Sequence, residues 1–150
     1  MKILVVDDSS TFRAIARKEL EEEGGYEIIE AEDGEIALET LMSTPVNLVT
    51  MDVEMPGLNG YEVCKKIRSE EYSSKIIGSA NNPLPLIFIT GNDSLEERAK
   101  GFEAGAADFI TKPFLSGELL ASVDRLLKPE NKFKGLTALV ADDSQVVRFI

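Results

Sequence analysis

The chain has 150 residues, 43% of them hydrophobic and 29% charged, which is ordinary for about one soluble globular domain with a buried core. Its 16 basic and 27 acidic residues leave a net charge of −11, which argues against direct binding of nucleic acid, because clustered Lys and Arg bind phosphate backbones. No apolar run approaches the roughly 18 residues of a membrane span, and the absence of histidine excludes His-based triads and most zinc sites.

Two features predict a cytoplasmic protein. The N-terminus runs directly into a short apolar strand, which is too short for the core of a signal peptide. Cys64 is the only cysteine, so no disulfide can form within the chain and a reducing compartment is the default. Cys64 lies on a predicted helix with Val63 and Ile67, and we expect it to be a core residue rather than a reactive thiol.

The chain begins with the pattern of a buried strand followed by an amphipathic helix. Residues 2–6 are apolar and β-branched and end abruptly at Asp7-Asp8, which indicates a buried strand. Ser9 or Ser10 can cap a helix that Gly24-Gly25 ends. The apolar residues of this helix recur at helical spacing and are Phe12, Ile15, Ala16 and Leu20.

The same alternation continues along the chain. Further strands are expected at residues 26–30, 46–51, 86–90 and 108–111. Further helices are expected after Asp33-Gly34, at about 61–68, from about 94 to 104, and at 115–127. Five strands that alternate with five helices imply βαβ units. The predicted fold is therefore α/β, a doubly wound five-stranded parallel sheet with helices on both faces.

Residues 69–85 form a long connection between a predicted helix and the fourth strand. The segment contains serines, asparagines, a glycine and two prolines, so we expect a surface excursion, and an inert insertion rather than a functional loop. Phe102, Phe114 and Leu119 are expected to pack in the core.

An internal repeat lies near the end of the chain. A shift of 135 positions aligns residues 3–15 with 138–150, and seven of the thirteen pairs are identical, against about one by chance. The prediction is therefore one domain at 1–127, a linker at 128–136 and the truncated start of a second domain at 137–150, which would make the chain a fragment. Asp142 and Asp143 are then expected to form no working metal site, and the tail to be poorly ordered or docked on another surface.

Chemically matched residues lie at the carboxyl ends of four predicted strands. Asp7, Asp8 and Asp52 would place three carboxylates together, an arrangement that requires a bound positive charge. Mg²⁺ fits best, with Mn²⁺ as an alternative, because it binds one or two carboxylates and keeps positions for phosphate oxygens. Lys112 supplies an ammonium and Thr90 a hydroxyl. Together the groups predict phosphoryl transfer with Asp52 as the nucleophile.

Each of these residues also has an ordinary structural explanation. Asp7-Asp8 could cap the next helix, Asp52 could belong to a turn, Thr90 could be a strand residue, and Lys112 a solvated charge. For Asp52, Thr90 and Lys112 taken singly, the ordinary explanation is preferred, whereas the Asp pair is evenly balanced. The joint arrangement has no structural need to explain it, and this favours the functional hypothesis.

Four segments of the chain resemble the signature segments of the response-regulator receiver family. They are VVDDS (5–9), MDVEMPGLNG (51–60), FITG (88–91) and FITKPF (109–114). All four occur in order with similar spacing, and the resemblance covers about residues 1–127. It implies a flavodoxin-like fold with strand order 2-1-3-4-5, and Mg²⁺-dependent phosphorylation by a histidine kinase or a small phosphodonor.

The resemblance also implies roles for individual residues around the metal ion. Asp8 and Asp52 would be direct ligands, and Asp7 would act through water. The backbone carbonyl of Glu54 would be the third protein ligand.

The remaining implied roles concern the phosphoryl group and the switch. Thr90 would hydrogen-bond the phosphoryl group, Lys112 would pair with it, and the bond between Lys112 and Pro113 would be cis. Phe109 occupies the position of the family's aromatic switch residue. It has no hydroxyl to offer a partner, but it can still change between buried and exposed rotamers.

Two other functions and several partners stay open. A Mg²⁺-dependent phosphohydrolase with an aspartate nucleophile and a pseudo-receiver that only binds protein are the alternatives. As a receiver, the chain would be no enzyme beyond its own phosphorylation and dephosphorylation, although a longer parent could carry an output such as a diguanylate cyclase. Expected partners are a histidine kinase or phosphotransfer protein and covalently linked downstream domains, with a homodimer as a further option.

Overall fold

A computed structural model describes residues 1–76, 83–92 and 94–128 of the chain, and its centre is a five-stranded parallel sheet. The strands are β1 (Lys2–Val6), β2 (Glu27–Ala31), β3 (Leu48–Asp52), β4 (Leu86–Thr90) and β5 (Asp108–Thr111). Their order in the sheet is β2-β1-β3-β4-β5, which confirms the expected topology. All five strands therefore present their carboxyl ends at one edge, where ligands bind in open α/β sheets.

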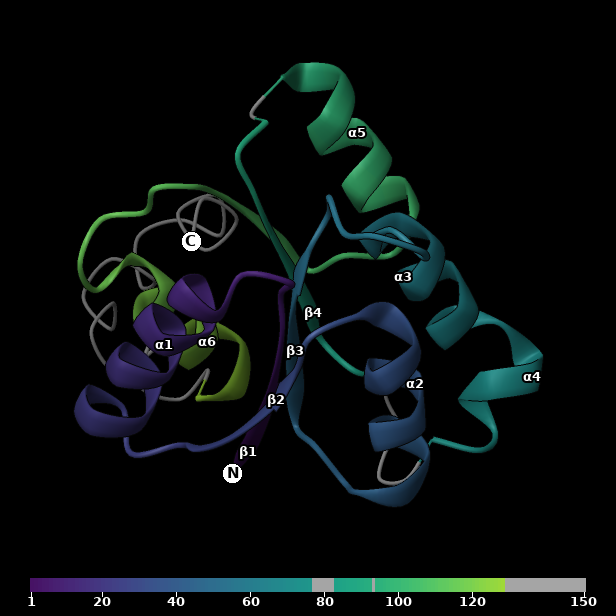
Figure 1. The fold of residues 1–150 in the computed structure, drawn as a ribbon, viewed down its shortest axis with the longest axis horizontal. Coiled ribbons are helices and arrows are strands. Elements are labelled where there is room, and N and C mark those ends of the chain that lie inside the picture. Colours follow the sequence, from purple (N-terminus) through teal and green to yellow (C-terminus); the bar gives the residue numbers. More distant parts are fainter. Residues whose placement is uncertain (77–82, 93, 129–150) are drawn as a thin grey trace, which may run out of the picture.

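Helices cover both faces of the sheet, as predicted (Figure 1). They are α1 (Ser10–Arg17), the π-helix η1 (Lys18–Glu23), α2 (Gly34–Ser43), α3 (Gly60–Arg68), α4 (Glu70–Ser73), α5 (Leu95–Glu103) and α6 (Glu118–Leu127). Figure 1 shows α1 and α6 on one side of the strands and α2 and α3 on the other. In the described part of the chain, no helix is long and apolar enough to cross a membrane.

The central strands are apolar along their whole length because both of their faces are covered. Every residue of β3 and β4 is buried. Along β1 the side chains alternate between two cores: Ile3 and Val5 face α1 and α6, and Leu4 and Val6 face α2 and α3. Each such side chain contributes about 1.5–3 kcal/mol through burial. The result is a rigid platform whose strand ends are held in fixed relative positions.

Short polar side chains begin the helices that follow the strands. Ser9, Asp33 and Ser94 accept hydrogen bonds from the backbone at the starts of α1, α2 and α5. Asn59 and Glu62 form a reciprocal capping box at the start of α3. These local bonds satisfy otherwise free N–H groups, and they fix the start of each helix near the strand ends that carry the acidic residues.

Two expectations about individual elements are wrong. The last helix begins at Glu118 rather than at residue 115, because Gly117 precedes it with a left-handed φ of +89°. Phe102 is 49% exposed rather than packed, because the small residues Gly101 and Ala104 form the buried side of this part of the chain. Ile15 is also exposed. Leu119 is fully buried and Phe114 partly buried, as expected.

Two residues of the connection at 69–85 are anchored in the core, one on each side of residues 77–82. The connection contains α4, and Ile76 and Leu84 are both buried in the cluster beneath α2 and α3. The prediction of a purely surface excursion is therefore wrong for Ile76 and Leu84, because burial of an apolar side chain is favourable. Residues 77–82 and 129–150 lie outside the described residues. The predicted linker at 128–136, apart from its first residue, and the predicted second repeat at 137–150 therefore lie outside them as well.

Cys64 is fully buried, with its sulfur 3.2 Å from the carbonyl oxygen of Ala104. Burial raises the pKa of the thiol, because the thiolate would be poorly solvated there. The prediction of a core cysteine is confirmed.

Gly60 brings the start of α3 against the end of β3, directly behind Asp52. Its N–H donates to the carbonyl of Val53 at 2.8 Å, and a Cβ at this position would overlap the backbone carbonyl oxygen of Asp52. We expect Gly60→Ala to lower the free energy of unfolding by about 1–3 kcal/mol, as overpacking against rigid backbone does. Urea unfolding measures this. The control Gly91→Ala places its Cβ in open space, and equal losses for the two variants would contradict the prediction.

Candidate functional site

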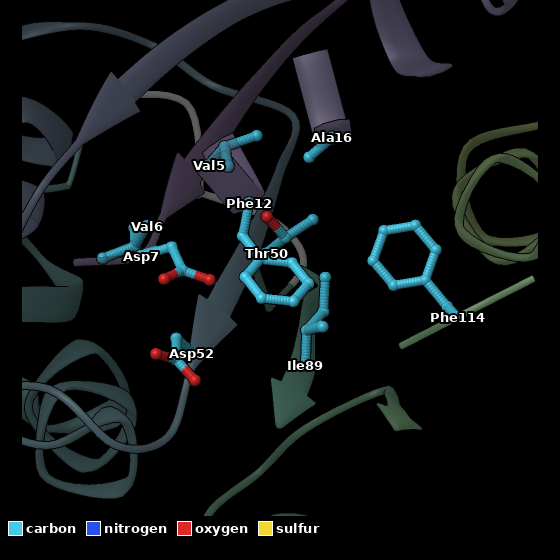
Figure 2. Close-up of a pocket in the computed structure, with 9 residues that line it drawn as sticks. All are labelled: Val5, Val6, Asp7, Phe12, Ala16, Thr50, Asp52, Ile89 and Phe114. Atoms are coloured by element: carbon cyan, nitrogen blue, oxygen red, sulfur yellow. The ribbon is translucent and has the colours of Figure 1, made fainter. Parts of the chain in front are cut away.

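The three predicted carboxylates meet at the carboxyl ends of two neighbouring strands. β1 pairs with β3, Asp7 and Asp8 follow β1, and Asp52 is the last residue of β3. Each of the three offers a carboxylate oxygen, and these oxygens all lie within 4.8 Å of one another. Figure 2 shows the carboxyl groups of Asp7 and Asp52 near one another at the ends of these strands.

Burial makes this cluster electrostatically costly. Asp7 is 5% exposed and Asp52 6%, whereas Asp8 is exposed to solvent. Burial raises the pKa of Asp52 to about 7, and the negative charges of Asp7 and Asp8 act in the same direction, against the lowering effect of Lys112. A hard divalent cation would favour the ionised form, and three converging carboxylate oxygens are ligands that Mg²⁺ accepts. The residues present therefore fit this ion.

Lys112 reaches the cluster from the end of β5. Its Nζ lies 2.8 Å from Oδ2 of Asp7 and 3.4 Å from Oδ1 of Asp52. The peptide bond between Lys112 and Pro113 is cis, as predicted. The ammonium also lies 4.0 Å from the centre of the Phe12 ring, a distance at which the ring face attracts a cation. Phe12 and the two carboxylates thus hold the ammonium on the inner side of the site.

The backbone turn after β1 is held by several hydrogen bonds. The N–H of Asp7 donates to the carbonyl of Ala31 at 3.1 Å, and Oδ1 of Asp7 accepts from the N–H of Ser9 at 2.9 Å. The carbonyl oxygen of Asp7 accepts from Nη1 of Arg13 at 2.7 Å. With Lys112 on Oδ2, every polar atom of Asp7 has a partner.

The other predicted site residues lie where their strands end. Thr90 is 1% exposed at the end of β4, and its hydroxyl accepts from the N–H of Asn92 at 3.3 Å. Glu54 is exposed in the loop after β3, two positions beyond Asp52.

Phe109, the predicted switch residue, is buried between aromatic and charged neighbours. Its ring meets that of Phe88 edge-on with 6.4 Å between centroids, and Phe88 in turn meets Tyr61 at 5.1 Å. The guanidinium of Arg98 lies 5.1 Å from the centre of the Phe109 ring. Gly101 of α5 makes room for these rings, since a Cβ there would lie 3.0 Å from Phe109.

A small cavity lies beneath the carboxylates. Its volume is about 10 Å³, close to the lower limit for one water molecule, so it does not hold an organic substrate. The residues that line it include Asp7, Phe12, Thr50, Asp52 and Phe114 (Figure 2).

The sequence did not indicate two contacts of α1 with the site. Phe12 was expected only as one of the apolar residues that recur along its helix, and Arg13 was given no role. Arg13 did carry a signal, because Arg148 stands at the matching position of the internal repeat together with the matching Asp pair. No sequence pattern distinguishes Phe12 from an ordinary packing residue.

Comparison with known proteins gives one consistent result. Residues 3–124 match the family model described as the response regulator receiver domain. The response regulator MprA of Mycobacterium avium is 37% identical over 145 residues, which is 95% of this chain and 59% of that protein. The chain thus spans about three fifths of this relative.

Solved structures agree with the family match. The BeF₃-activated receiver domain of DrrB, a protein of Thermotoga maritima, is 31% identical with a TM-score of 0.70, over 85% of this chain and 97% of that one. The receiver domain of the sensor histidine kinase PA1611 of Pseudomonas aeruginosa, solved with a magnesium ion in its active-site cleft, is 26% identical with a TM-score of 0.69. That match covers 83% of this chain and 95% of the PA1611 domain.

Proposed function

Because the chain belongs to the response regulator receiver domain family, we propose that it is a phosphorylation-dependent switch that accepts a phosphoryl group on Asp52 with Mg²⁺. One observation carries the proposal: Asp52 is nearly buried at a strand end where two further carboxylates and the ammonium of Lys112 converge on it. A structural carboxylate has no need of such surroundings.

In the proposed step, a carboxylate oxygen of Asp52 forms a bond to phosphorus while the bond from phosphorus to the donor's leaving group breaks. The product is an acyl phosphate on Asp52. Lys112, already 3.4 Å from Asp52, would offset negative charge on the phosphoryl oxygens. Thr90, at the end of the neighbouring strand, would donate its hydroxyl to one of them. The burial of the site excludes water from most of the nucleophile.

Asp8 and Asp52 would hold the Mg²⁺ ion directly, Asp7 through water, and Glu54 through its backbone carbonyl. Bound there, Mg²⁺ supplies charge neutralisation and orients the phosphoryl oxygens. Two facts support this assignment. The three carboxylate oxygens lie within 4.8 Å of one another, and the PA1611 receiver was solved with magnesium in its cleft. Mn²⁺, which also accepts oxygen ligands, is an alternative ion.

Thr90 and Phe109 would transmit a conformational change from the phosphorylated site to partner proteins. They lie on adjacent strands, and Phe109 is buried behind Arg98 in this structure. Movement of Thr90 toward a phosphoryl group would leave space that the Phe109 side chain can enter. The related DrrB domain was solved in a BeF₃-activated state.

The partners proposed for the chain follow from its family. They are a histidine kinase or phosphotransfer protein and covalently linked downstream domains, with the repeat at 137–150 as the start of a second receiver. A homodimer is a further option, and the cytoplasm is the proposed location. The chain would catalyse only its own phosphorylation and dephosphorylation.

Incubation with acetyl phosphate and Mg²⁺ tests the proposal. Intact-mass measurement should show one phosphoryl group per chain for as long as the donor is present. The labelling should require Mg²⁺. Continuous release of phosphate with many turnovers per minute would instead indicate a phosphohydrolase. A chain that is never labelled would indicate a pseudo-receiver.

We expect Asp8→Ala to weaken Mg²⁺ binding by more than about 10-fold, because even residues that only support a ligand contribute that much. Titration calorimetry on the wild-type chain should give one site. The control Glu103→Ala removes an equal charge from the exposed end of α5 and should bind Mg²⁺ as the wild type does. A second site of similar affinity that requires Asp143 would contradict the prediction.

A further inference from the structure

We infer that Arg13 is a positioning residue for the acidic site, which holds the Asp7–Asp8 peptide in place through the backbone carbonyl of Asp7. The inference rests on the proposed function, since it concerns the same carboxylates and the Mg²⁺ ion that they would bind. It assigns a role to a residue of α1 that offers no ligand atom itself.

The contact acts on the part of the turn that orients Asp8. Nη1 of Arg13 donates to the carbonyl oxygen of Asp7 at 2.7 Å, a short bond for a charged donor. This carbonyl belongs to the same planar peptide unit as the N–H of Asp8, so its direction sets the plane from which the Asp8 side chain departs. Asp8 is the exposed member of the cluster, and its carboxylate is therefore the one least held by packing.

Arg13 is itself fixed in position. Its Nε donates to Oε1 of Glu30 at 2.9 Å, and its side chain is only 16% exposed. Glu30 also accepts from Nε of Arg17 at 2.7 Å. The two arginines, Arg17 more strongly, hold the pKa of Glu30 below its usual range, so the carboxylate stays charged and the anchor is present at neutral pH. β2 thereby ties the first turn of α1 to the end of β1.

Position rather than charge is the contribution of Arg13. A cation beside a metal site would by itself repel Mg²⁺, and Glu30 offsets the charge of Arg13. Arg17 provides the comparison within the same helix: it shares Glu30, but its Nη2 approaches the carbonyl of Ile28 at 3.4 Å and does not contact Asp7. The repeat adds an independent observation, since Arg148 accompanies Asp142-Asp143 with the spacing of Arg13 to Asp7-Asp8.

The experiment compares Mg²⁺ dissociation constants of wild type, Arg13→Ala and Arg17→Ala by calorimetry, together with their urea unfolding without metal. We expect Arg13→Ala to bind Mg²⁺ about 10-fold more weakly, the lower range for residues that orient ligands. Arg17→Ala should bind Mg²⁺ within about twofold of wild type, because this variant loses a contact to Glu30 but keeps the hydrogen bond between Arg13 and the Asp7 carbonyl. A merely structural role would lower stability in both variants and leave Mg²⁺ affinity unchanged in both.

Equal Mg²⁺ affinity of wild type and Arg13→Ala, or equal weakening in both arginine variants, would overturn the inference. Should Arg13→Ala not fold, Arg13→Lys serves instead, because it keeps the charge and replaces the planar fork by a single ammonium. It should bind Mg²⁺ severalfold more weakly, and wild-type affinity there would equally overturn the inference. Wild-type protein that binds no Mg²⁺ would overturn the proposed function as well, so the two failures are distinguishable.

Discussion

Asp52→Asn protein should take up no phosphoryl group from acetyl phosphate, under conditions in which the wild type is labelled once per chain. The amide lacks the nucleophilic carboxylate oxygen but has nearly the same shape, so the rest of the site is retained. Asp52 is the expected phosphoacceptor because its carboxylate lies 3.4 Å from the ammonium of Lys112 and because β3, which it ends, pairs with the strand that ends at Thr90. Intact-mass measurement, followed by peptide mapping of the wild type, provides the test.

Asp33→Asn is the matched control for this experiment. It makes the same carboxylate-to-amide change, and asparagine caps a helix as well as aspartate does, so α2 is preserved. We expect it to be labelled like the wild type. Full labelling of the Asp52→Asn chain would move the phosphoacceptor to another residue and overturn the assignment.

Without metal, Asp52→Asn should also be more stable than the wild type at pH 8 by up to about 4 kcal/mol. The pKa of Asp52 is raised from 3.8 to about 7 in the folded protein, chiefly by burial and then by Asp7. Between these two values the folded chain binds a proton that the unfolded chain has released, so rising pH favours unfolding by about 1.4 kcal/mol per pH unit. Above the folded pKa the full cost is present, and the asparagine variant avoids it.

The difference in stability between Asp52→Asn and the wild type should depend on pH. Below pH 4 both states of the wild type bind the proton, and the two proteins should differ little through this group. The difference should grow from pH 4 to 7 and then level off. Added Mg²⁺ should reduce it at pH 8, because the ion binds the chain with the charged Asp52 carboxylate more tightly than the chain with the neutral amide. Urea unfolding at several pH values in EDTA provides the measurement, and a constant difference from pH 4 to 8 would contradict it.

Local patterns in the sequence predicted the five strands and the helices between them, but not the short helix α4 or the start of α6. Residues 86–90 and 108–111 are strands with the predicted bounds, because a continuous apolar run between polar turns has few other ways to bury itself. The helix starts at Ser9 and Asp33 also follow from neighbouring residues, since a cap acts over three positions. Strand order was implied only by the resemblance to a family.

The residues of the candidate site could likewise be predicted from the sequence, because they lie at the ends of apolar strands. Asp7, Asp8 and Asp52 do meet, and Lys112 does reach them. Sequence alone could not show that Lys112 lies closer to Asp7 than to Asp52. Lys112 and Asp7 are 105 positions apart in the chain, and the distance between them depends on how β5 is placed in the sheet.

Only the tertiary structure decided which side chains near the site have a partner. Arg13 and Arg17 lie one turn apart on α1, and the internal repeat marks Arg13 without showing what it contacts. The packing of α1 against β1 and β2 brings Arg13 to the Asp7 carbonyl and Arg17 to the Ile28 carbonyl. Phe102 is apolar but exposed, because the buried side of its helix is built from smaller residues. Burial and partnership depend on contacts between distant segments, whereas periodicity and capping act within a few residues and can therefore be predicted from sequence.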